Sequence, residues 1–280
     1  MVNKNLKVDL HIHSAASDGT WSPEKIVNEI KKAKVELFSL TDHDSIGNVE
    51  KMKKLIFSEQ LNFIPGIEIS STHNENLYHI LAYGTDNSNE KLRKVLNRNT
   101  ILLEEKDDNA IKNLIKDGYD INFDEYVNYK HISERGGWKA LNFLIDKGYC
   151  KDVSDYFTRL FAGKKDMQFP IFEETEKVIN VIKNAGGVAI LAHPYYVEID
   201  TPVEKRLGTL KDIGIEGVEC YHPNHSKEKI VSCVEWCRKN DMIITAGSDC
   251  HGDFIKKRKI GMMNVSIDDI SLKHLKDYII

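Results

Sequence analysis

The stretch Lys7–Asp18, which reads KVDLHIHSAASD, constrains this chain more than any other. Its apolar residues at alternate positions predict a strand over residues 8–12. Because strand side chains alternate between two faces, Asp9, His11 and His13 are expected on one face. Two imidazoles on one face bind a metal ion through neighbouring coordination positions. The alternative is a strand with two buried, hydrogen-bonded histidines, and an HxH pair alone does not decide between them.

Composition limits the class of protein. Of the 280 residues, 41% are hydrophobic and 29% are charged, which is ordinary for a globular protein with a substantial core. A formal net charge of −4 argues against a generally basic nucleic-acid binder but leaves room for a local basic pocket. No apolar run could span a membrane and no signal peptide is evident, so we expect a cytoplasmic protein without a membrane partner. The five cysteines lack zinc-site spacing, which favours small buried apolar residues over thiolate ligands.

Strand and helix signals alternate along the first part of the chain. Ser22 fits the cap of a helix and Pro23 its first position, while Ile26 and Ile30 give that helix one apolar face. A second helix is expected over residues 49–59, and further strands near residues 37, 65 and 80. This alternation predicts parallel β/α units.

The pattern changes over residues 89–172, where apolar residues recur at helical spacing and strand signals nearly vanish. We therefore expect an α-helical insertion at 89–172, carried by a barrel made of residues 1–88 and 173–280. A lid over the substrate is the preferred interpretation, because candidate metal residues flank the insertion on both sides. A solvated helical bundle without a role in the site is the alternative.

The β/α pattern resumes after residue 173, with strands expected near residues 190, 217 and 244 and a helix over 227–238. Seven strands are thus predicted, each with polar residues at or just beyond its C-terminal end. In parallel β/α barrels the active site is built at that end from several strands. The candidate ligands gathered there are His11, His13, Asp18, His43, Glu68, His79, His193, Asp249 and His251.

So many imidazoles and carboxylates at one barrel end predict bound cations, since unpaired carboxylates in a partly dehydrated pocket cost several kcal/mol each. Nine candidates exceed the needs of one ion. We therefore expect two or three divalent ions, with Glu68 as the bridging carboxylate. Mixed nitrogen and oxygen ligands favour Mn²⁺, Fe²⁺ or Zn²⁺ over Mg²⁺ or Ca²⁺.

Five motifs in this order resemble the PHP (polymerase and histidinol phosphatase) superfamily: DLHIHSAASDG at 9–19, LTDHD at 40–44, GIEIS at 66–70, AHP at 192–194 and GSDCHG at 247–252. The resemblance implies an α/β fold, a distorted (β/α)7 barrel, and the activity of a metal-dependent phosphoesterase. It also implies a trinuclear site. One ion would bind His11, His13, Glu68 and Asp249, a second Glu68, His79 and His193, and a third Asp18, His43 and His251.

Within that superfamily, the helical insertion and the segment GVECYHPNH at 217–225 are similar to a branch of nucleoside 3′,5′-bisphosphate phosphatases and enzymes that act on nucleotide or RNA ends. That branch often carries Arg-Pro-His in the insertion, where this chain has Arg135-Gly136-Gly137-Trp138. We expect Arg135 to hold a phosphate bidentately and His222 to bind phosphate at the pocket rim. His225 either binds phosphate or caps the following helix, and Trp138 either stacks on a base or packs in the insertion.

The predicted reaction is hydrolysis of a nucleotide phosphomonoester, such as a nucleoside 3′,5′-bisphosphate or AMP, by a metal-activated water. The catalytic candidates are His11, His13, Glu68, Asp249 and His251. Alternatives are a histidinol-phosphate phosphatase, a 5′-3′ exonuclease on short RNA and a non-catalytic metal-stabilised domain of a polymerase. An amidohydrolase is disfavoured, since no strand ends in the lysine that such sites usually carry. No obligate protein partner is evident.

Overall fold

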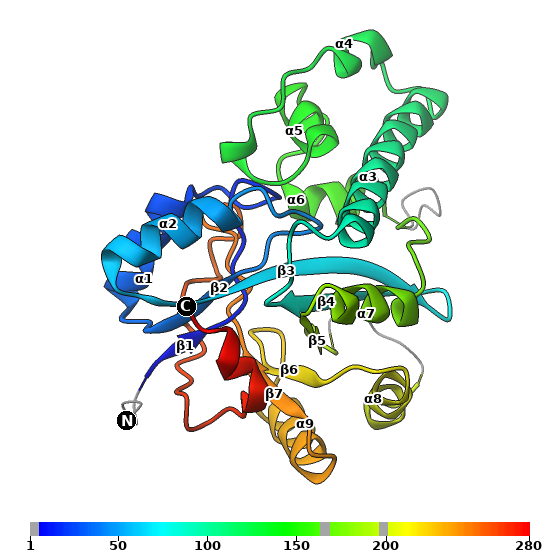
Figure 1. Ribbon diagram of the computed structural model, residues 1–280. Helices are drawn as coiled ribbons and strands as arrows, with labels where there is room; N and C mark the ends of the chain where they lie inside the picture. The colour runs from blue at the N-terminus through cyan, green and yellow to red at the C-terminus, as the bar shows by residue number, and fades with distance from the viewer. Residues whose placement is uncertain (1–5, 163–168, 196–200) are drawn as a thin grey trace.

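The computed structural model describes residues 6–162, 169–195 and 201–280 (Figure 1). Within these ranges, seven strands form one sheet whose order in space is their order along the chain. They are β1 (Val8–Asp9), β2 (Leu37–Leu40), β3 (Asn62–His73), β4 (Asn76–Tyr83), β5 (Val188–Leu191), β6 (Gly217–Tyr221) and β7 (Ile243–Ala246). All seven lie where the sequence predicted strands.

The sheet curls into a nearly closed barrel, because the segments that follow its first and last strands bind each other. Leu10 N donates to Ala246 O at 2.8 Å, and Asp249 N donates to His11 O at 2.9 Å. An isolated parallel bridge joins Ile12 to Cys250 one step further along. The predicted fold class, a distorted seven-stranded α/β barrel, is confirmed.

Helices pack around the barrel: α1 (Pro23–Ala33), α2 (Val49–Glu59), α7 (Thr175–Asn184), α8 (Val203–Asp212) and α9 (Lys227–Lys239). Helix α1 begins as its sequence predicts, because the Ser22 side chain accepts a hydrogen bond from Lys25 N, and Ile26 and Ile30 are fully buried. Helix α8 and the C-terminal 3₁₀ helix η4 (Lys273–Tyr278) were not predicted. No helix among the described residues is long and apolar enough to cross a membrane.

One part of the predicted topology is wrong. Strand β4 pairs antiparallel with both β3 and β5, so this part of the barrel is not a parallel β/α unit. His73 pairs with Asn76, and the two residues between them, Asn74 and Glu75, have φ values of 48° and 63°. Positive φ at both central residues is typical of a tight type I′ hairpin turn. The turn contains no glycine, which explains why the sequence did not signal it.

The described residues between β4 and α7, here called the insertion, contain helices and no strand. They are α3 (Glu90–Lys116), α4 (Phe123–Val127), the 3₁₀ helix η1 (Ser133–Arg135), α5 (Lys139–Asp146), α6 (Val153–Asp155) and the π-helix η2 (Tyr156–Leu160). Long helix α3 joins two hydrophobic cores, since Leu92 packs in the barrel core and Leu114 in a separate core of the insertion. Figure 1 shows the insertion projecting from one end of the barrel.

Candidate metal centre

Three fully buried side chains, His11, His13 and Glu68, lie at the centre of the site. The histidines follow β1, which has only two residues, but the chain remains extended through its bridge to Cys250. The alternation of side chains therefore continues beyond the strand, and both rings point to the same side. Glu68 lies in the middle of β3 rather than at its end, contrary to expectation.

The first group of donors consists of His11, His13, Glu68 and Asp249. His11 Nε2 lies 3.1 Å from His13 Nε2 and 3.0 Å from Glu68 Oε2, and His13 Nε2 lies 3.1 Å from Asp249 Oδ1. Atoms that bind one ion at about 2.0–2.2 Å lie roughly 3–3.6 Å from each other. The spacing of these four side chains therefore fits a single divalent cation.

Glu68 faces a different set of histidines with each of its two oxygens. Oε2 lies 3.0 Å from His11 Nε2 and 3.2 Å from His13 Nε2. Oε1 lies 3.0 Å from His79 Nδ1 and 2.8 Å from His193 Nε2. This division of the carboxylate between two groups of donors is the geometry of a bridging ligand.

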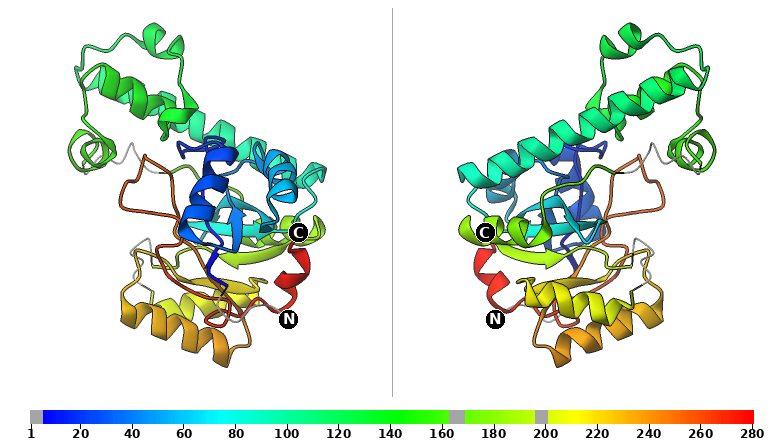
Figure 2. Two further views of the ribbon diagram at one scale, coloured as in Figure 1. Left: turned by 90° about the vertical axis from the view of Figure 1, so that its left-hand side faces the viewer. Right: turned by 90° about the vertical axis from the view of Figure 1, so that its right-hand side faces the viewer.

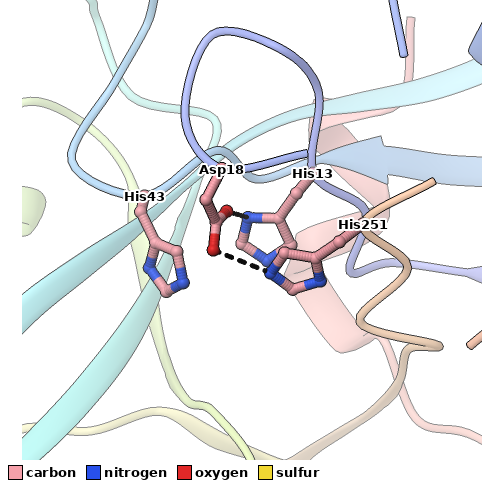
Figure 3. A group of neighbouring side chains, drawn as sticks. All are labelled: His13, Asp18, His43 and His251. Atoms are coloured by element: carbon pink, nitrogen blue, oxygen red, sulfur yellow. Dashed lines mark ion pairs between the residues drawn. The ribbon is translucent and has the colours of Figure 1, made fainter. Parts of the chain in front are cut away.

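A further group contains His13, Asp18, His43 and His251 (Figure 3). Asp18 Oδ2 lies 3.2 Å from His251 Nε2, and Asp18 Oδ1 lies 3.7 Å from His13 Nδ1. His43 also approaches Glu68 and His79, since its Nδ1 is 3.2 Å from Glu68 Oε2. The geometry thus brings together all nine residues named from the sequence, but it assigns His13 and His43 to more than one group.

Electrostatics favour the ionised carboxylates that a cation needs. Burial opposes ionisation of Glu68, but His43 and His11 beside it hold the pKa of its carboxyl well below its usual value. Burial likewise opposes the imidazolium form of His13, yet hydrogen bonds to Asp249 and Glu68 raise its pKa to about 10. The protons held by such histidines are those that a metal ion displaces when it binds.

Glu219 belongs to this site, although the sequence analysis assigned it no role. It is fully buried on β6, its Oε1 lies 3.0 Å from His11 Nδ1, and its Oε2 accepts a hydrogen bond from His193 N at 2.9 Å. By accepting the Nδ1 proton of His11, Glu219 leaves Nε2 as the nitrogen that faces Glu68. A carboxylate inside an otherwise apolar strand was the signal that could have identified it.

Asp249 is held by two further side chains, His222 and Arg258. His222 Nδ1 accepts a hydrogen bond from Asn224 N, so its Nε2 carries the proton and donates to Asp249 Oδ2 at 3.2 Å. Arg258 donates to the same oxygen. His222, expected to bind phosphate at the pocket rim, is fully buried and contacts Asp249. Arg258 was missed because a surface loop separates it from every motif.

The aspartates that flank His43 shape the surrounding loops. Asp42 accepts hydrogen bonds from Ser14 N and from the Ser14 and Ser17 hydroxyls, which fixes the loop that carries Asp18. Asp44 accepts from the Ser70 hydroxyl at 2.8 Å and from Asn99 Nδ2 at 2.7 Å. Asn99 lies on α3, so this contact ties the insertion directly to the site.

The structure gives Arg135 a protein partner in place of the phosphate expected from the sequence. Its two terminal nitrogens each lie 2.7 Å from one oxygen of Asp146, a bidentate ion pair at the surface of the insertion. Trp138 is half-buried and packs edge-on against Tyr156 and Phe254.

His225 does not cap α9. Ser226 caps that helix through Lys229 N, and His225 Nδ1 lies 2.9 Å from Cys220 O. The capping role considered for His225 is therefore wrong, and phosphate binding by this buried side chain stays a prediction.

Three cysteines meet where α9 packs against β6, since Cys220 lies on β6 and the other two lie one helical turn apart on α9. Cys220, Cys233 and Cys237 are buried within the barrel core, and Cys220 Sγ lies 3.6 Å from Cys237 Sγ. Their sulfur atoms are close enough to share an ion, which their spacing in the sequence did not indicate. They pack among isoleucine and valine side chains, in keeping with the predicted role as small apolar residues.

Comparison with known proteins identifies the family. A family model described as the PHP domain matches residues 9–188. The chain is 27% identical over 249 residues to a 5′-3′ exoribonuclease of Haemophilus influenzae, with 88% of this chain and 90% of that protein covered. It is 24% identical over 265 residues to a 3′,5′-nucleoside bisphosphate phosphatase of Chromobacterium violaceum, with 91% and 90% covered.

A solved structure agrees on the fold. A protein from Bifidobacterium adolescentis, described as a metal-dependent phosphoesterase, aligns with a TM-score of 0.80 at 24% identity, over 94% of this chain and 93% of that one. The matched family model covers more than half of the chain and includes His11, Glu68 and His79. The chain therefore belongs to the PHP domain family of metal-dependent phosphoesterases.

Proposed function

We propose that this protein hydrolyses a phosphomonoester of a nucleotide, with a nucleoside 3′,5′-bisphosphate as the preferred substrate. The observation that carries the proposal is the division of Glu68 between His11 and His13 on one oxygen and His79 and His193 on the other. Such a bridged pair of donor groups suits two ions that act on one phosphoryl group. Bound divalent ions would supply an activated water and offset the charge on the phosphoryl oxygens.

The residues of the chain orient this chemistry. Glu219 fixes the tautomer of His11, and His222 with Arg258 fixes the carboxylate of Asp249. His251 Nδ1 lies 2.8 Å from the backbone oxygen of Asp249, which directs its other nitrogen toward Asp18. These three candidate ligands are thus held in position before substrate arrives, and positioning of this kind contributes much of the catalysis in phosphoryl transfer.

The open side of the site supports a substrate larger than inorganic phosphate. Asp18 and His43 are the most exposed of the candidate ligands, with 23% and 25% of their side chains accessible. The insertion lies directly beside them, since Gly137 N donates to Asp18 O at 2.8 Å. We propose that residues 89–172 form a separate domain that contacts the nucleotide part of the substrate.

A comparison of substrates tests the proposal. The metal-loaded protein should show a higher kcat/KM for a nucleoside 3′,5′-bisphosphate than for the corresponding 5′- or 3′-monophosphate, because a site with several cations attracts the more highly charged ligand. Histidinol phosphate and simple sugar phosphates serve as controls. A preference for histidinol phosphate, or equal rates on all phosphomonoesters, would reject the bisphosphate and retain the phosphoesterase.

The same relatives suggest the second candidate, an exonuclease that removes nucleotides from RNA ends. The basic residues at 256–259 favour contact with a chain of several phosphates, because one of them, Arg258, already reaches Asp249 in the metal centre.

A further inference from the structure

The loop that follows β7 carries a run of four basic residues, Lys256, Lys257, Arg258 and Lys259. The three lysines are exposed, whereas the side chain of Arg258 is only 12% accessible. Arg258 turns inward and donates to Asp249 Oδ2. One basic residue of the run therefore contacts a candidate metal ligand, and its three neighbours face solvent.

The start of this loop is packed between the barrel and the insertion. Gly252 lies against Trp21, since a Cβ atom there would come within 3.0 Å of the indole ring. On the other side, the ring centroid of Phe254 is 6.4 Å from that of Trp138, and Phe254 also borders Gly136. Figure 2 shows the segment after β7, in dark orange, rising from the barrel toward the insertion. The basic run thus begins beside the open side of the metal centre.

The charge of the loop contrasts with that of the whole chain. The protein has a formal net charge of −4, yet the four basic residues follow one another with only Asp253 nearby in the loop. Asp253 already accepts a hydrogen bond from Trp21 Nε1 at 2.9 Å. Like charges at consecutive exposed positions repel one another, and an anionic ligand with several phosphates would offset that repulsion.

The proposed substrate indicates which anion this is. A nucleoside 3′,5′-bisphosphate has the same arrangement of phosphates as the 5′-phosphorylated end of a polynucleotide, in which the chain continues from the 3′-phosphate. Single-stranded nucleic acid is bound by basic side chains along its backbone and by aromatic side chains that stack on its bases. Here Phe254 precedes the lysines by two residues in the chain and contacts Trp138, and both rings are half-buried.

We propose that Lys256, Lys257 and Lys259 bind the backbone phosphates of a short single-stranded RNA whose 5′ end enters the metal centre. This inference rests on the proposed function, because it extends the same site toward the 3′ side of its nucleotide. The lysines act in binding alone, and the metal centre performs the hydrolysis.

The matched control uses lysines at the opposite end of the barrel. Lys183, Lys211 and Lys239 are exposed and lie in the last turns of α7, α8 and α9, which end where the next strands of the barrel begin. Replacing them with glutamine removes the same charge as Lys256→Gln, Lys257→Gln and Lys259→Gln. Both triple variants are compared with the wild-type holoenzyme.

Binding is measured by fluorescence anisotropy with a 5′-phosphorylated RNA of about five nucleotides, within the site size of a single-strand binding module. Phosphorothioate linkages protect the RNA from cleavage. We expect the Kd to rise about tenfold in the loop variant and to change less than about twofold in the control. The slope of log K against log[salt] should fall by about 2 in the loop variant, since each phosphate contact with a single strand contributes about 0.7.

Hydrolysis of a nucleoside 3′,5′-bisphosphate is measured in parallel, which separates this inference from the proposed function. The loop variant should retain it. RNA binding equal in the two triple variants, or absent in the wild type, would overturn the inference and leave the proposed function standing. Loss of bisphosphate hydrolysis in the loop variant would place the lysines in the nucleotide site itself and also overturn it. RNA binding by a wild-type protein that does not hydrolyse the bisphosphate would instead reject the proposed function.

Discussion

At the residue scale, Glu68 is the side chain on which the whole metal centre depends, because five imidazoles contact its two oxygens. We expect Glu68→Gln to lower metal content and to reduce kcat by more than the roughly 10–100-fold typical of a residue that only orients a ligand. The neutral amide offers one acceptor and turns two donor protons toward nitrogens that should bind metal. Elemental analysis and kcat test this directly.

The control for that variant is Glu235→Gln, which removes an exposed carboxylate from α9. Far-UV circular dichroism should be the same for both variants and the wild type. Full metal content together with normal turnover in Glu68→Gln would show that the carboxylate is not a bridging ligand.

Glu219 provides the second prediction at this scale. Burial opposes its ionisation, but His11 beside it holds the pKa of Glu219 at about 2, so the carboxylate is charged at neutral pH. Glu219→Gln weakens the acceptor that fixes His11, and we expect metal affinity or kcat/KM to fall about 10–100-fold. The control is Glu216→Gln, which changes a partly exposed carboxylate three residues earlier in the chain. A loss as large as that of Glu68→Gln would mean that Glu219 binds metal itself.

Residues that orient a metal ligand, such as Glu219, were not predicted from the sequence. The nine candidate ligands could be named because histidines and carboxylates stand out after short apolar runs. Glu219 stands out only as a carboxylate in an apolar strand, and neither its role nor that of Arg258 could be predicted, since both roles depend on which ligand lies across the barrel. Arg135 has a partner that the sequence did not predict, because a guanidinium suited to a phosphate is equally suited to the carboxylate of Asp146.

At the scale of elements, the connection between the insertion and the barrel depends on Gly136. Its φ is +73°, and a Cβ atom there would lie 2.9 Å from Asp18 O and 2.8 Å from Phe254 Cβ. Gly148 has a similar φ of +76° but nothing within 4 Å of such an atom. Both positions have a positive φ, but Gly136 also has a ψ of 174°, in a region that essentially only glycine adopts, and it alone approaches the site closely.

We therefore expect Gly148→Ala to destabilise the protein by about 1–2 kcal/mol because of its positive φ. Gly136→Ala should destabilise it more, because the added methyl group also meets Asp18 O and Phe254 Cβ. Only Gly136→Ala should also reduce kcat/KM, because its methyl group pushes the insertion away from Asp18. Chemical denaturation and steady-state kinetics on the same samples separate the two effects. Equal kinetics in both variants would show that this contact does not influence the site.

Local signals predicted most elements but not their pairing. The strand positions and the start of α1 follow from short-range patterns, namely apolar runs and a Ser-Pro cap. The direction of β4 depends instead on the turn at Asn74 and Glu75. The hydrophobic pattern predicted β3 and β4 as two strands but not the hairpin that joins them. His79 consequently reaches the site from the middle of an antiparallel strand.

At the scale of the whole molecule, the metal centre brings together three carboxylates whose negative charge bound cations would offset. Asp18, Glu68 and Asp249 lie among the buried histidines where the first and last strands of the barrel meet. Ions bound there would join segments from both ends of the chain, since His11 follows β1 and Asp249 follows β7. Binding should therefore stabilise the entire barrel and not one loop.

The last prediction measures that stabilisation. A ligand at 100 times its Kd contributes about 2.7 kcal/mol to the native state. A domain of this size shifts by roughly 2–4 °C per kcal/mol, so adding Mn²⁺ or Zn²⁺ to chelator-treated protein should raise Tm by about 5–10 °C. Glu68→Gln, which breaks the bridge between the donor groups, should lose most of the shift, whereas Glu235→Gln should keep it. A Tm independent of metal would mean that no ion binds preferentially to the native state, and the metal centre would then be wrong.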